Sequence, residues 1–276
     1  MIKLLYPFLS LICLIFLSCE RENEEKTTEY YLHLAHTRTN SNPKMDSLVE
    51  KIDYNKFDML WLGGDLANLT SVDDQTMNHV DSIFDLGNEN TLWSLGNHDY
   101  SDIKRVEKYT NRTHYYSFFK NDITFVVLDT QDSLSNIMGA QKEYLFGILD
   151  TIRNSSHLIL LHHKLIWMYD NPELEPQISD ISNAGIGDCF YCINPNNFYE
   201  DIYPELVITK QNGIEVICIG GDIGFNAKEF EYLTKEGIYF LASGIKFSDQ
   251  TNKAIVFTHQ LDHNDLQWDF KLLSDL

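Results

Sequence analysis

The chain has 276 residues, of which 43% are hydrophobic and 22% are charged. This length and composition are typical of one globular domain with a substantial core. The formal net charge is −20, from 21 basic and 41 acidic residues, and such a surface repels phosphate groups, which argues against nucleic acid and anionic lipid as partners.

Residues 1–19 have the pattern of an export signal rather than of a folded element. A lysine precedes a mostly apolar stretch over 4–17, and the segment ends in a serine and Cys19. This resembles a bacterial lipoprotein signal, in which Cys19 becomes the lipid-carrying N-terminus; an ordinary cleaved signal or an uncleaved anchor is the alternative. Residues 20–29 are polar and charged, which is typical of a solvated tether. We therefore expect an extracytoplasmic lipoprotein, facing the periplasm or the cell surface, held to the membrane through Cys19.

Residues 30–276 form the folded domain, and no linker interrupts them. In the first half, apolar runs predict strands, and amphipathic spacing with capping residues predicts helices. Strands are predicted over 30–36, 57–62, 91–95, 115–119 and 123–128, and helices over 43–52, 71–84, 103–109 and 141–152.

The second half is richer in strands. A strand over 157–161 precedes a long irregular stretch, 164–196, and a loop of that length in a compact domain is usually functional. Helices are then predicted over 197–211 and 230–234, and strands over 214–219, 238–242, 254–259 and 266–272. Helices between the early strands and strand-rich segments later indicate a mixed α/β architecture.

Three cysteines lie inside the domain. Cys218 falls within an apolar run and is interpreted as an inert buried thiol. Cys189 and Cys192 lie in the long loop, without the second cysteine pair that zinc would need and without a thioredoxin-like context. In an oxidising compartment we expect these two to form a disulfide.

Five predicted strand ends carry side chains that can bind metal or transfer protons. They are His36; Asp65; Asn97 with His98; His162 with His163; and Asp222. Chemistry in α/β sheets gathers beyond the carboxyl ends of strands, so we expect these groups to converge. Asp, Asn and His together suit manganese, iron, zinc or magnesium. Taken alone, the Asn97–Asp99 segment could equally be a polar turn that closes a strand.

The order of these motifs resembles the calcineurin-like metallophosphoesterases, which include the purple acid phosphatases. Gly64-Asp65, Gly96-Asn97-His98-Asp99 and His162-His163 follow one another as in that family. The resemblance covers nearly all of the domain and implies an α/β fold of two mixed β-sheets packed as a sandwich flanked by helices. It also implies two cations about 3.5–4 Å apart at the strand ends, which activate a water and clamp the phosphate oxygens.

Two motifs depart from the family's pattern. The usual Asp-X-His is replaced by Leu34-Ala35-His36, and the usual Gly-His-X-His by Gly221-Asp222-Ile223-Gly224. Residue by residue, the resemblance leaves the first metal with only His36 and the shared Asp65. The second metal keeps four candidates, which are Asp65, Asn97, His162 and Asp222. We therefore expect one divalent cation and no well-held pair.

Further residues are candidates for the chemistry itself. His98 resembles the family's acid that protonates the leaving oxygen, positioned by Asp99; a structural histidine is the alternative. Arg38 offers a fixed positive charge that could neutralise phosphate where the first metal would sit; a surface arginine on a loop is the alternative.

Two functions are open from the sequence. The first is a membrane-anchored enzyme that hydrolyses a phosphate mono- or diester of a small molecule or glycan. The second is a catalytically inactive domain whose cleft binds a phosphorylated or acidic glycan or a partner protein. The lost ligands of the first metal favour the inactive domain, whereas the complete Gly-Asn-His-Asp block favours the enzyme, which we prefer.

Overall fold

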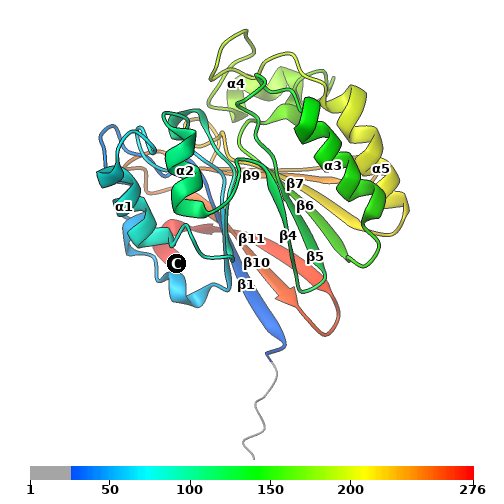
Figure 1. Ribbon diagram of the computed structural model, residues 1–276, viewed down its shortest axis with the longest axis horizontal. Helices are drawn as coiled ribbons and strands as arrows, with labels where there is room; N and C mark the ends of the chain where they lie inside the picture. The colour runs from blue at the N-terminus through cyan, green and yellow to red at the C-terminus, as the bar shows by residue number, and fades with distance from the viewer. Residues whose placement is uncertain (1–25) are drawn as a thin grey trace, which may run out of the picture.

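The computed structural model describes residues 26–276, so the predicted signal, Cys19 and most of the predicted tether lie outside the described residues. The described chain is arranged in four layers, with helices outside and two sheets inside (Figure 1). Among residues 26–276, none of the helices is long and apolar enough to cross a membrane.

The first sheet has five strands in the order β11-β10-β1-β2-β3. They are β1 (Thr28–Leu34), β2 (Met59–Leu62), β3 (Thr91–Trp93), β10 (Lys253–Gln260) and β11 (Asp265–Leu272). β1, β2 and β3 run parallel, whereas β10 pairs antiparallel with both β1 and β11. The carboxyl ends of the three parallel strands therefore share one edge.

The second sheet has six strands in the order β4-β5-β6-β7-β9-β8. They are β4 (Tyr116–Lys120), β5 (Ile123–Val127), β6 (His157–His162), β7 (Glu215–Gly220), β8 (Glu229–Leu233) and β9 (Tyr239–Ser243). The four central strands run parallel, and β4 and β8 are antiparallel at the two edges. Because both faces of this sheet are covered, β5 and β6 are buried along their whole length.

The layers are held together by three apolar clusters. Side chains alternate along a strand, so Phe125 contributes to the core between the sheets while its neighbour Val126 packs against the outer helices. Trp61 and Phe257 lie at the centre of the inter-sheet core, with ring centroids 4.4 Å apart. Burial of each such aromatic side chain contributes about 1.5–3 kcal/mol.

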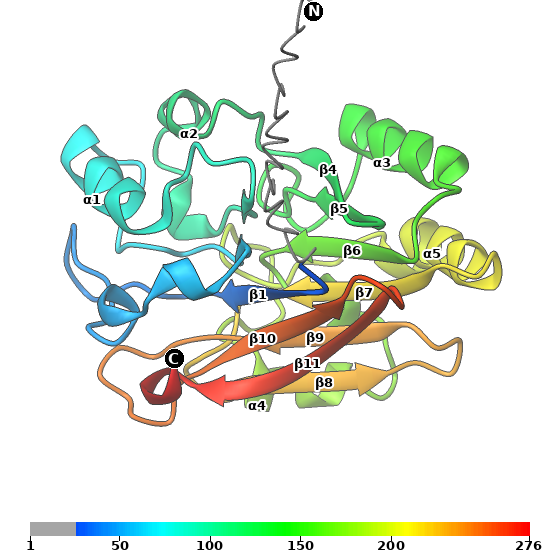
Figure 2. The same cartoon turned by 90° about the horizontal axis from the view of Figure 1, so that it is seen from below.

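The helices cover the two outer faces (Figures 1 and 2). The first sheet is covered by α1 (Asp74–Phe84) and α2 (Ile103–Thr110), and the second by α3 (Gly139–Thr151), α4 (Ile178–Ile181) and α5 (Tyr203–Gln211). Asp73 caps α1 by accepting a hydrogen bond from the Thr76 N–H at 2.7 Å. The predicted fold class, two mixed sheets flanked by helices, is confirmed.

Two predicted elements are wrong. Residues 43–52 do not form one helix, because this segment bonds to distant groups: the Asp46 N–H donates to the Thr37 carbonyl at 2.8 Å, and a short 3-10 turn occupies Val49–Lys51. Residues 230–233 of the segment 230–234, which was predicted to be helical, belong to β8, which pairs antiparallel with β9. In both cases tertiary contacts override the local pattern.

Candidate functional site

A pocket of about 190 Å³ lies at the edge where parallel strands of both sheets end. Its walls come from the ends of β1, β2, β3 and β7 and from two loops, through His36, Arg38, Asp65, Asn97, His98, Asn183, Ala184, Tyr191, Asp222 and Phe225. The structure therefore brings together six of the residues that the sequence indicated. They are His36, Arg38, Asp65, Asn97, His98 and Asp222.

Glycines allow the two sheets to approach at this edge. Gly63 follows β2 in the first sheet, and Gly221 follows β7 in the second. A Cβ atom on Gly221 would lie 1.9 Å from the Gly63 carbonyl oxygen, so no larger residue fits there. This close approach places Asp65 and Asp222, which come next along the chain, on one pocket.

Asp65 is the shared group of the site. Its buried carboxylate accepts a hydrogen bond from the His98 backbone N–H at 2.9 Å through Oδ1. Its Oδ2 lies 3.6 Å from His36 Nε2 and 3.8 Å from Arg38 Nε. Burial alone would raise the pKa of Asp65, but the neighbouring imidazoles, His163 first, hold it below its usual range.

Asp99 has a different role from the predicted one. Its fully buried carboxylate accepts hydrogen bonds from three backbone N–H groups, those of Asp65 (2.7 Å), Leu66 (3.1 Å) and Gly96 (2.8 Å). It also accepts one from the Thr70 hydroxyl. Asp99 therefore fastens the loop after β2 to the loop after β3, and the expectation that it positions the His98 ring is corrected.

The His98 ring is positioned by a backbone carbonyl instead. Its Nδ1 donates to the Asn68 carbonyl oxygen, and because a carbonyl can only accept, Nδ1 carries a hydrogen. Its Nε2 lies 4.0 Å from Asp65 Oδ2, and the side chain is 24% exposed. A half-buried imidazole at the pocket wall can exchange a proton with a bound molecule.

His163, rather than His162, joins the acidic group. His163 Nε2 lies 3.7 Å from Asp65 Oδ1 and 3.9 Å from Asp222 Oδ1. Burial alone would lower the pKa of His163, but these two carboxylates raise it above its usual value. Burial raises the pKa of Asp222 as well. The three side chains thus form one tightly coupled electrostatic group.

The prediction of His162 as a ligand is corrected by strand geometry. Its Nδ1 donates to the Lys164 carbonyl at 2.7 Å, and its ring packs edge-on against Trp167, 4.6 Å between centroids. Leu161 belongs to the inter-sheet core and Trp167 to the core under the outer helices. Since successive side chains alternate, His163 shares the side of Leu161 and His162 the opposite side. The residues between His157 and His162 are all apolar and buried, so the sequence of this strand carries no signal that could have identified His163.

The donor types suit one divalent cation, although the side chains are spread apart in the structure. His163 Nδ1 donates to the Gly63 carbonyl at 2.7 Å, so in the neutral ring it is Nε2 that carries the lone pair. Nε2 has no hydrogen-bond partner among residues 26–276. An imidazole oriented through its other nitrogen is the usual form of a metal ligand. Within residues 26–276, however, no group of three or more His, Cys, Asp or Glu side chains is already close enough to hold a metal ion. The 3.7 and 3.9 Å separations would have to shorten to roughly 3.4 Å, the spacing of ligand atoms around a tetrahedral cation.

The long loop contributes to the pocket. It contains the predicted disulfide between Cys189 and Cys192, which is confirmed. Tyr191 lies between the two cysteines and lines the pocket although it is 63% exposed. Cys218 is buried and, among the described cysteines, unpaired, and burial raises the pKa of its thiol.

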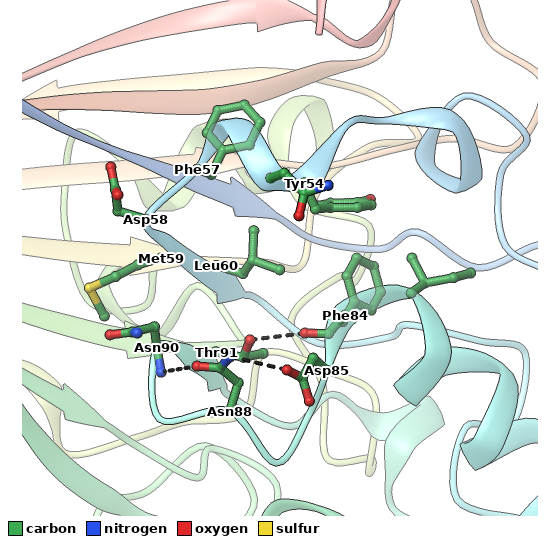
Figure 3. Close-up of a pocket in the computed structure, with 12 residues that line it drawn as sticks. Tyr54, Phe57, Asp58, Met59, Leu60, Phe84, Asp85, Asn88, Asn90 and Thr91 are labelled. Carbon is green, nitrogen blue, oxygen red and sulfur yellow. Dashed lines mark hydrogen bonds between the residues drawn. The ribbon is translucent and has the colours of Figure 1, made fainter.

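A larger hollow, about 390 Å³, lies at the opposite end of β2 and β3 (Figure 3). Its polar groups bond to one another: Asn88 Nδ2 donates to Asp85 Oδ2 at 3.0 Å, and the Asn90 N–H donates to Asn88 Oδ1 at 2.9 Å. None of the residues that the sequence singled out lines it. The smaller pocket is therefore the candidate site.

Comparison with known proteins shows the family and the fold. Residues 32–222 match the model of the calcineurin-like phosphoesterase family. A search of curated proteins finds no match. A dimetal phosphatase from Danio rerio has the same fold, with a TM-score of 0.58, 11% sequence identity, and 89% of this chain aligned to 96% of that one.

Two further solved structures align with most of this chain. They are the NAD nucleotidase of Haemophilus influenzae (TM-score 0.43, 13% identity, 89% of this chain and 50% of that one) and a 5'-nucleotidase precursor from Thermus thermophilus (TM-score 0.38, 9% identity, 89% and 54%). This chain spans about half the length of each. The family match covers well over half of the chain and includes every pocket residue except Phe225. The chain therefore belongs to the calcineurin-like phosphoesterase family.

Proposed function

We propose that this protein hydrolyses a phosphate mono- or diester of a small molecule or glycan with the help of one divalent cation. The observation that carries the proposal is the buried His163 Nε2, which has no hydrogen-bond partner among residues 26–276. It lies 3.7 and 3.9 Å from the carboxylates of Asp65 and Asp222, which line the same pocket as His98. Four groups would hold the cation, and they are Asp65, Asn97, His163 and Asp222. Family membership supports the reaction class.

The cation would be manganese, iron, zinc or magnesium. Bound there, it supplies positive charge that lowers the pKa of a water molecule and offsets the charge of the phosphate oxygens. Asp222 stands where the family has a neutral imidazole, and its additional negative charge favours the harder cations of this set. The Asn97 amide contributes an oxygen without adding charge.

His98 supplies the proton for the leaving group. The hydrogen bond from Nδ1 to the Asn68 carbonyl fixes the ring, and the second hydrogen of the protonated ring is on Nε2. When the ester P–O bond breaks, the leaving oxygen takes this Nε2 proton, and His98 regains one from water.

An inactive binding domain is the second candidate. It is favoured by the loss of two family ligands, at Leu34 and Gly224. It is also favoured because, among residues 26–276, no three His, Cys, Asp or Glu side chains lie close enough together to hold a metal ion. Such a domain would hold a phosphorylated or acidic glycan, or a partner protein, in the same pocket without turning it over.

Hydrolysis of p-nitrophenyl phosphate and bis(p-nitrophenyl) phosphate distinguishes the two candidates. We expect the full-length protein, loaded in turn with Mn²⁺, Fe²⁺, Zn²⁺ and Mg²⁺, to hydrolyse at least one ester, and EDTA to abolish the activity. Asp65→Ala should lose the activity, and His98→Ala should lower kcat by about 10²–10⁴. A cation-loaded wild type no faster than Asp65→Ala on either ester would leave the inactive domain as the function.

We also propose that the protein is a lipoprotein, with residues 1–19 as the signal, Cys19 as the lipidated residue, 20–29 as the tether and 30–276 as the domain. The support is the sequence pattern, and the domain's first strand, β1, begins at Thr28, close to the proposed tether's end. Cys19→Ser should move the protein from the membrane to the soluble fraction or block its processing. Unchanged fractionation and migration would exclude the anchor.

A further inference from the structure

We propose that the guanidinium of Arg38 takes the place of the first cation of a two-metal site, and holds the phosphate there. The inference rests on the proposed function and specifies how the phosphate is bound. It follows from four features of the pocket, two that exclude a cation and two that position the arginine.

The first feature is Leu34, at the position of the missing carboxylate. Leu34 is fully buried in the apolar cluster between the first sheet and its covering helices. It offers no donor atom, and it packs away from the inter-sheet side. The end of β1 therefore contributes only His36 to this part of the pocket.

The second feature is the backbone at Gly224. Its φ is +132°, and a Cβ atom would lie 2.7–2.9 Å from the main-chain O, N and C atoms of Ile245. No histidine fits at this position unless the backbone moves. The same Ile245 carbonyl accepts a hydrogen bond from His36 Nδ1 at 3.0 Å, so the segment that excludes one ligand also orients the remaining one.

The third feature is where the guanidinium lies. Arg38 Nε is 3.8 Å and His36 Nε2 is 3.6 Å from the same oxygen, Asp65 Oδ2. The other oxygen, Oδ1, lies 3.7 Å from His163 Nε2. Asp65 thus has one oxygen on the proposed cation side and one on the arginine side, as a bridging carboxylate would have between two metals. Because a guanidinium does not lose its proton, its charge repels a second cation from this position.

The fourth feature is that the guanidinium lies at the pocket wall with its Nε–H unpaired within the described chain. The Arg38 side chain is 16% exposed, its guanidinium lies 5.8 Å from the centroid of Phe225, and its backbone bridges to Met45. Within the described chain, the buried Nε has no hydrogen-bond partner. A guanidinium in this place offers a planar set of N–H donors that matches two oxygens of a phosphate group.

The test combines metal content with phosphate affinity. The full-length protein and its variants are loaded with Mn²⁺, desalted and analysed for bound metal, and inorganic phosphate is titrated calorimetrically into each loaded protein. The variants are Arg38→Met, which removes the charge, Arg38→Lys, which keeps the charge but not the planar N–H donors of the guanidinium, and Arg153→Met as the matched control. Arg153 lies outside the pocket and donates to the Ile152 carbonyl at 2.6 Å.

We expect about one Mn²⁺ per chain in all four proteins. Arg38→Met should weaken phosphate binding at least tenfold, Arg38→Lys by a smaller factor, and Arg153→Met should leave it unchanged. Two tightly bound Mn²⁺ per wild-type chain, or an unchanged phosphate affinity in Arg38→Met, would overturn the inference. If ester hydrolysis is absent but the phosphate affinity of Arg38→Met falls as expected, phosphate binding by Arg38 is supported and the proposed hydrolytic activity is excluded. Hydrolysis by a protein that holds two Mn²⁺ would support the enzyme and exclude the Arg38 site.

Discussion

Asp99 is expected to be a structural anchor of the site. Asp99→Ala removes the acceptor for three backbone N–H groups and one hydroxyl in a fully buried place. A buried donor left without a partner costs about 1–3 kcal/mol, but removing the carboxylate also removes its own desolvation cost. The free energy of unfolding should therefore fall by about 3–6 kcal/mol. Thr70→Ala leaves the other three donors bonded to Asp99 but also removes the acceptor of the Ala67 N–H, so it should cost about 1–3 kcal/mol.

Urea unfolding at pH 7, followed by tryptophan fluorescence without added cation, measures these losses. A loss below about 1 kcal/mol in Asp99→Ala would refute the anchoring role. Asp99→Asn then distinguishes a structural role of Asp99 from an effect on proton transfer by His98. If the Asn68 carbonyl positions His98, this variant should have a lower free energy of unfolding, while the pH at which its kcat falls should be the same as in the wild type. A shifted limb of that pH profile would show that Asp99 acts on the His98 ring after all.

Three further outcomes are expected. His163→Ala should abolish Mn²⁺ binding in calorimetry, whereas His162→Ala, on the other side of β6, should retain it; the reverse result would make His162 the ligand. Burial lowers the pKa of His33 to about 3. Below pH 6.5 this histidine is therefore protonated in the unfolded chain but neutral in the folded chain, so the free energy of unfolding falls as the pH drops. From pH 7 to pH 5, His33 lowers the free energy of unfolding by about 2 kcal/mol. The free energy of unfolding of His33→Asn, measured with urea, should therefore depend less steeply on pH than that of the wild type, and an equally steep dependence would contradict this. Alkylation without reductant, read by mass spectrometry, should label neither Cys189 nor Cys192, and full labelling would exclude the disulfide.

The fold was predictable where local pattern and tertiary packing agree. The buried strands β5, β6 and β7 are apolar runs, and the Asp73 cap marks the start of α1. The segment 43–52 was not predictable in this way, because its backbone bonds to Thr37, which lies in another loop. The same holds for β8, whose alternating residues form a strand only because β9 pairs beside it.

The site was predictable in composition but not in detail. The glycine-rich strand ends identified most of the pocket, since such turns are where functional groups converge. The roles of two residues depended on groups distant in the sequence: Asp99 bonds to backbone N–H groups 33 and 34 positions earlier, and Gly224 is closed off by Ile245. The choice of His163 over His162 follows from the alternation of side chains along a strand only once the packing of Leu161 and Trp167 is known.

The central claim is that one cation and one arginine share the Asp65 carboxylate. Anomalous X-ray scattering from crystals soaked in Mn²⁺ and inorganic phosphate tests it most directly. We expect a single anomalous peak within coordinating distance of Asp65, Asn97, His163 and Asp222, with phosphate oxygens on the Arg38 guanidinium. Two peaks about 3.5–4 Å apart, the second beside His36, would contradict it, as would a single peak on the His36 side of Asp65.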